Sequence, residues 1–163
     1  MSDPEFIVKS GDTLVVSTQS PISITLITVT NTTSSKPLTA TAKGNEIRIT
    51  LEGTSLLHND KKALCIKPDI ETIQVKALYT NGNFSKPGTL NIPISNPSGA
   101  NRSALSKLKN ADKFVIAKNK YSNIVVTPES QAIDTTNSAT DPNPYTFEAA
   151  FELNSAPASM KFA

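Results

Sequence analysis

The stretch YTFEAAFELN, residues 145–154, decides the fold because two kinds of side chain alternate along it. One parity is apolar and consists of Tyr145, Phe147, Ala149, Phe151 and Leu153. The other parity consists of Thr146, Glu148, Ala150, Glu152 and Asn154. A period of two indicates a β-strand with one buried face. At about 25 cal/mol per Å² of buried apolar surface, its aromatic rings contribute several kcal/mol, so this strand is predicted to carry much of the core.

The same period runs through the first two thirds of the chain. Alternating segments are predicted at Leu14–Thr18, Ile22–Leu26, Glu46–Leu51, Ile73–Tyr79 and Leu90–Ile94. Between them lie turn clusters at Asn31–Pro37, Asn81-Gly82 and Pro87-Gly88. Short strands at this spacing predict an all-β, antiparallel β-sandwich.

Two details refine the strand prediction. The apolar parity changes after Leu26, at Ile27 and Val29, which indicates either a β-bulge or a strand covered on both faces. Pro93 lacks an N–H group, so its strand is predicted at a sheet edge or with that position facing solvent.

The pattern changes at Asn96-Pro97-Ser98-Gly99. Asn101 is a suitable helix cap, and Ala104, Leu105 and Leu108 follow at helical spacing, so one short helix is predicted near 101–110. Residues 7–163 are predicted to form a single domain, with a subdivision near 96–101 as the alternative. Residues 1–6, MSDPEF, are interpreted as an expression scar.

Composition excludes several classes of protein. The net charge is only +2 and β-branched residues are abundant, so the chain does not resemble a disordered one. No run approaches the roughly 18 apolar residues of a membrane-spanning helix. No apolar stretch follows Met1, and given the scar we expect any native signal peptide to be missing from this chain.

Residues that commonly carry chemistry are scarce. Cys65 and His58 are the only residues of their types, which excludes an intrachain disulfide and leaves too few ligands for a structural zinc site. Cys65 is interpreted as a buried apolar residue and His58 as an exposed loop residue. Glu148 and Glu152 lie about 13 Å apart on one strand face, too far for a glycosidase pair. We therefore expect no enzyme, no catalytic residue, no metal site and no cofactor.

Two segments remain as candidates for binding. Oxygen-bearing side chains gather in a long polar loop at Asp134, Asn137, Asp141 and Asn143, but without EF-hand spacing, and ion binding there stays open. Residues 102–120 carry a net charge of +5, with one acid, Asp112, against Arg102, Lys107, Lys109, Lys113, Lys118 and Lys120. This segment is a candidate site for an anionic glycan; nucleic acid fits less well because few aromatic residues are interleaved.

Residues 22–95 resemble the Ig-like repeats of bacterial envelope and surface proteins. The matching residues are Ile27–Asn31, the lone Cys65 before Pro68, Ile73–Tyr79 and Gly88–Ile94. The resemblance implies an Ig-like sandwich used for display, spacing or adhesion, located outside the cytoplasm in the periplasm, on the cell surface or secreted. The paired cysteine of many such domains is missing, and residues 96–163 have no counterpart.

Three functions remain open. The first is a structural or interaction domain of a bacterial envelope, secretion or surface system, binding a protein partner or its own copies through edge strands and loops. The second is an accessory domain that binds an anionic ligand, a glycan or a nucleic acid, through residues 102–120. The third is a structural protein of a virus or phage.

Overall fold

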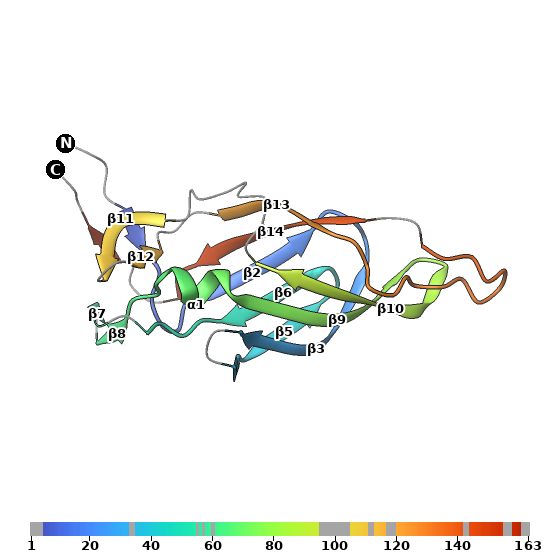
Figure 1. The fold of residues 1–163 in the computed structure, drawn as a ribbon. Helices are drawn as coiled ribbons and strands as arrows, with labels where there is room; N and C mark the ends of the chain where they lie inside the picture. Colours follow the sequence, from blue (N-terminus) through green and yellow to red (C-terminus); the bar gives the residue numbers. More distant parts are fainter. Residues whose placement is uncertain are drawn as a thin grey trace.

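The computed structural model describes residues 5–32, 35–54, 56, 58–59, 61–94, 105–110, 113–116, 120–141, 144–154 and 158–160. Two antiparallel sheets of these residues pack face to face (Figure 1). The larger sheet has the order β13-β14-β2-β6-β5, with strands at Lys120–Val126, Tyr145–Glu152, Thr13–Thr18, Glu46–Thr50 and Ala40–Lys43. The smaller has the order β10-β9-β3-β4, with strands at Phe84–Pro93, Ile73–Asn81, Ser23–Asn31 and Lys36–Pro37. The predicted all-β antiparallel sandwich is confirmed.

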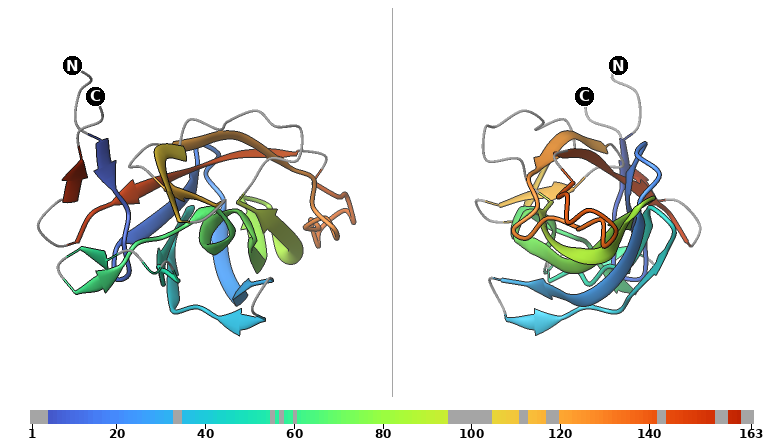
Figure 2. Two further views of the ribbon diagram at one scale, coloured as in Figure 1. Left: turned by 60° about the vertical axis from the view of Figure 1, so that its left-hand side comes forward. Right: turned by 90° about the vertical axis from the view of Figure 1, so that its right-hand side faces the viewer.

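Three two-stranded ribbons accompany the sandwich within the described residues. They are β1 (Glu5–Ile7) with β15 (Ala158–Met160), β7 (His58–Asn59) with β8 (Lys62–Ala63), and β11 (Leu105–Asn110) with β12 (Lys113–Ile116). The three ribbons lie toward one end of the molecule, opposite the turn between β9 and β10 (Figures 1 and 2). The interpretation of residues 1–6 as a scar stays untested, although Glu5 and Phe6 belong to β1.

The core lies between the two sheets, and β14 occupies the position that its sequence predicts. Its four apolar residues through Phe151 are buried, while Thr146 and Glu152 are exposed. β14 pairs with β2 on one side and β13 on the other. The facing sheet contributes buried residues of β9 and β10, among them Val75 and Ile92. One continuous apolar core therefore joins the first and last thirds of the chain.

The parity change in β3 is a β-bulge, as one of the two interpretations predicted. The register against β9 shifts between Leu26 and Thr28, so Ile27 is the inserted residue and is 53% exposed. Ile24 before it and Val29 after it are both buried. The extra residue thus returns both halves of the strand to the core.

β10 is an edge strand, as Pro93 predicted. The backbone N–H of Ile94 donates to the carbonyl of Ile73 in β9 at 3.2 Å. N–H groups alternate in direction along a strand, so an N–H group at position 93 would point away from β9. Proline at this position therefore removes no hydrogen bond to that strand.

The predicted position of the helix is wrong. Leu105–Asn110 forms β11 and pairs antiparallel with β12, and residues 101–104 lie outside the described part of the chain. A helix of about ten residues and an isolated hairpin are both marginal in water, so tertiary context decides between them. Here β12, which carries β-branched and aromatic residues, lies against α1 and pairs with Leu105–Asn110. The helix of the described residues is α1 (Lys67–Glu71), which has Pro68 in its first turn.

Candidate functional site

The long polar loop between β13 and β14 covers the open edge of β10. The N–H of Lys86 donates to the carbonyl of Ile133, and the N–H of Ile133 donates back to Lys86, both at 3.0 Å. Thr89 exchanges two further bonds with the loop, donating to Ser130 at 2.8 Å and accepting from Glu129 at 3.0 Å. An edge that would otherwise be a template for another chain is therefore partly closed by the protein itself.

Gly88 permits this close approach. A Cβ atom at this position would collide with the backbone oxygen of Ser130, the backbone nitrogen of Ala132 and the ring of Tyr79. The absence of a side chain at residue 88 is thus what allows the loop to lie against β10.

The loop then folds back on itself as a small hairpin. Asp134 donates its N–H to Ala139 at 2.8 Å, and Ser138 donates to Asp134 at 2.8 Å. This hairpin and the β9–β10 turn form the end of the molecule opposite the three ribbons (Figure 1). We call residues 81–87 and 129–141 the distal end.

The oxygens considered for calcium are used within the loop. Asp134 Oδ1 accepts the N–H of Thr136 at 2.9 Å, and Asn137 Oδ1 accepts the N–H of Ala139 at 3.0 Å. Such bonds are the ordinary role of Asp and Asn in turns. Asn143 lies outside the described residues. Within the described part, no group of three or more His, Cys, Asp or Glu residues is placed to hold a metal ion.

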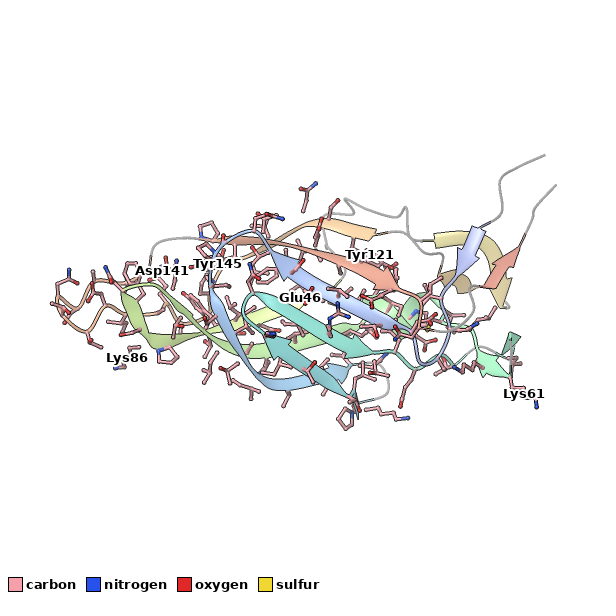
Figure 3. The ribbon with its side chains drawn as sticks, turned by 180° about the vertical axis from the view of Figure 1, so that it is seen from behind. Glu46, Lys61, Lys86, Tyr121, Asp141 and Tyr145 are labelled. Carbon is pink, nitrogen blue, oxygen red and sulfur yellow. The ribbon has the colours of Figure 1, made fainter. Side chains whose placement is uncertain are left out.

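Asp141, the last residue of the distal end, has a different role because it is fully buried. It lies beside Tyr145 (Figure 3). Its Oδ2 accepts the hydroxyl of Tyr145. Asn81 Nδ2 reaches the Tyr145 hydroxyl oxygen at 2.9 Å and Asp141 Oδ2 at 3.4 Å. The backbone N–H of Asp141 donates to Ala132 at 2.8 Å. This network joins the loop to β14 and to the end of β9.

A second tyrosine extends the network. The hydroxyl oxygen of Tyr79 accepts the N–H of Ala132 at 3.0 Å, and its ring meets that of Tyr145 edge-on, with centroids 5.4 Å apart. Burial raises the pKa of the Tyr145 hydroxyl, and its hydrogen bond to Asp141 raises it further. Burial likewise raises the pKa of Tyr79, and the nearby charge of Asp141 adds to this rise. Both phenols therefore stay neutral over the ordinary pH range, and Tyr145 remains a donor to the carboxylate.

Sequence reasoning missed this network. It assigned Tyr145 to the core and Asp141 to a polar loop in which ion binding stayed open, and it did not connect these two residues. The available signal was an acid close to the start of a strongly apolar strand.

The basic segment is only partly described. Lys107 and Lys109 lie in β11, Lys113 in β12 and Lys120 in β13, while Arg102 and Lys118 lie outside the described residues. The backbone register places Lys113 opposite Asn110. Of the six basic residues, three thus lie in the β11–β12 ribbon and one lies at the start of β13, the next strand along the chain. Anion binding there stays a prediction.

The scarce reactive residues have structural surroundings. Cys65 is fully buried, and burial raises the pKa of its thiol, so it packs as an apolar residue as predicted. His58 lies in the β7–β8 ribbon rather than in an open loop. Glu152 lies on the outer sheet face, where its Oε2 accepts from Arg48 Nη1 at 3.0 Å.

An open cavity of about 610 Å³ lies beside α1. The carboxylate of Asp69 in its wall accepts the N–H groups of Thr54 and Ile66, both at 2.9 Å, and the Thr54 hydroxyl at 2.6 Å. Lys36 Nζ and Glu52 Oε2, also in the lining, form an exposed ion pair at 2.6 Å. Asp69 therefore stabilises the position of α1 against the segment after β6.

No helix among the described residues is long and apolar enough to cross a membrane.

Comparison with known proteins completes the assignment. A search of curated proteins finds no match. Residues 1–158 match the model of a family described as "Contractile injection system spike tip protein". This span is far longer than the Ig-like resemblance at residues 22–95, and it supports a structural protein of bacterial or phage type without specifying an Ig-like repeat. With nearly its whole length matched, the chain belongs to the contractile injection system spike tip family.

Proposed function

We propose that this chain is a non-enzymatic structural subunit that sits at the tip of the spike of a contractile injection system. The family match over residues 1–158 carries the proposal. It favours the hypothesis of a phage-type structural protein over that of an envelope display or adhesion domain. Its partner would be a protein of the spike, and it would act outside the cytoplasm of the cell that makes it.

The shape of the molecule supports this role. The strands of both sheets run roughly along its long axis, and the distal end closes that axis (Figures 1 and 3). Within that end, residues 135–140 are exposed, small and uncharged. Load applied along the axis would meet paired strands end-on, with the loop already fixed to β10 and β14 by hydrogen bonds. A subunit that leads a spike needs such a fixed end.

The proposal is tested on assembled particles. An epitope-tagged chain is expressed in the source cells, contractile particles are purified, and the chain is sought by immunoblot and by electron microscopy with gold-labelled antibody. We expect the label at one end of the spike and its loss in cells that lack the gene. Particles that are complete yet contain none of this chain would contradict the proposal.

A further inference from the structure

The two ends of the molecule differ in whether the edges of their strands are covered. At the distal end, residues 129–133 cover part of the β10 edge. Toward the opposite end lie the ribbons β1–β15, β7–β8 and β11–β12 (Figures 1 and 2). We call the three ribbons together the ribbon end.

Two-stranded ribbons are incomplete as sheets. The β1–β15 ribbon pairs three residues of each strand, with Glu5 opposite Met160 and Ile7 opposite Ala158. In the β1–β15 and β11–β12 ribbons, the described residues provide a ladder on one side of each strand only. The β7–β8 ribbon is already joined to the chain before β2, because Ser10 donates its N–H to the carbonyl of Ala63 at 2.9 Å. Isolated pairs of strands are marginal in water, and their outer N–H and C=O groups are templates for a further strand. The ribbon end is thus suited to receive a strand from a partner.

The distal end differs in its surface, although its loop also folds back as a small hairpin. Residues 135–140, TTNSAT, are exposed, small and uncharged. The exposed large apolar residues of the described chain are Ile27, Leu56 and Val125, and none belongs to the distal end. Stable protein interfaces have a core of buried apolar and aromatic residues, which this surface does not offer.

We infer that the ribbon end attaches the chain to the spike by accepting a β-strand from a spike protein, and that the distal end points away from the spike. The inference rests on the proposed function and adds an orientation and a mode of attachment to it. The partner is a protein chain with an extended segment or an open sheet edge.

The test compares two shortened variants in purified particles. One lacks residues 155–163 and therefore β15, which leaves β1 without its partner strand. The matched variant replaces residues 135–138 by Asn-Gly, a pair suited to a two-residue turn, and so shortens only the distal end. We expect the first deletion to lower the amount of chain per particle about tenfold or more, equivalent to a loss of about 1.4 kcal/mol in binding. The distal variant should be incorporated like the wild type.

A point substitution protects the test against misfolding. Ser159→Pro removes one N–H from β15 and weakens either the ribbon or an added strand, whichever side that N–H faces. Circular dichroism and thermal melting verify that each variant is folded. If the deletion variant unfolds, reduced incorporation of folded Ser159→Pro supports the inference.

Two results would overturn the orientation. One is loss of the distal variant from particles that retain the deletion variant, and the other is equal retention of all the variants. If the wild-type chain itself is absent from the particles, the proposed function fails before its orientation is in question.

Discussion

Removing one oxygen atom should weaken the distal end measurably. Tyr145→Phe keeps the ring that contacts Tyr79 but deletes the hydroxyl that donates to Asp141. Both Tyr145 and Asp141 are buried, at 2% and 0% exposure, so water cannot easily replace the lost donor. Asn81 would lose its acceptor at the phenol and keep the longer contact to the carboxylate.

The magnitude follows from the type of bond that is lost. A hydrogen bond to a charged group contributes about 1.5–3 kcal/mol, and an apolar ring of the same shape leaves no cavity beyond the hydroxyl. We expect the free energy of unfolding to fall by about 2–3 kcal/mol, because the carboxylate stays buried with fewer donors. At about 2–4 °C per kcal/mol for a domain of this size, the melting temperature should fall by about 5–10 °C.

Urea denaturation followed by circular dichroism measures the effect. The midpoint should fall with an unchanged slope, since the folded state stays compact. Tyr121→Phe is the matched control, because the hydroxyl of Tyr121 reaches Glu71 Oε2 only at 3.3 Å and Glu71 is half-exposed. We expect that control to cost less than about 1 kcal/mol. If Tyr145→Phe costs no more than the control, the buried network does not hold the loop.

Three further predictions use the same structure. All three tyrosines are buried with raised pKa values, so above pH 10, the ordinary phenol value, the unfolded chain releases protons that the folded chain keeps. Stability should then fall by up to about 1.4 kcal/mol per pH unit for each tyrosine, and tyrosinate absorbance should appear only with unfolding; free titration of the folded protein near pH 10 would contradict this. Gly88→Ala should lower the free energy of unfolding, measured in urea, by about 2–3 kcal/mol, because the new Cβ atom would collide with the loop. The control Gly44→Ala should cost about 1 kcal/mol, because Gly44 has open space around it and only its positive φ is unfavourable for alanine. Equal costs would contradict the close approach of the loop to Gly88. The triple change of Lys107, Lys109 and Lys113 to Glu should abolish salt-sensitive retention on heparin, and an unmodified protein that is not retained at low salt would end the anion-binding hypothesis.

The strands were predictable where one face is buried and the other is not. In β14 the alternation identifies both the strand and its buried face, and each predicted core residue through Phe151 is buried. The bulge at Ile27 and the edge position of Pro93 were predictable for the same reason, since each is a local break in a regular pattern. Local chemistry determines these features.

Features that depend on distant partners were not predictable. The segment Leu105–Asn110 has helical spacing, but pairing with Lys113–Ile116 decides its conformation. Its own residues do not reveal that preference. The loop gave no sign that Ser130 and Ile133 would pair with β10, because their partners lie more than forty positions earlier in the chain. Helix α1 did carry a local signal, in Pro68 followed by Asp69 in its first turn.

The buried acid is best understood from the composition of the loop that it holds. Residues 135–140 have small, uncharged side chains, so their burial could contribute little apolar surface to fix the loop in place. A charge-assisted hydrogen bond concentrates its stabilisation at one point and requires donors only within a short distance. Tyr145 and Asn81 supply such donors from two strands of different sheets. The cost of burying Asp141 is thereby offset where the loop returns to the sandwich. The loop is fixed in this way without a large exposed apolar residue at the distal end, and under the proposed function this would keep a leading end from adhering to other proteins.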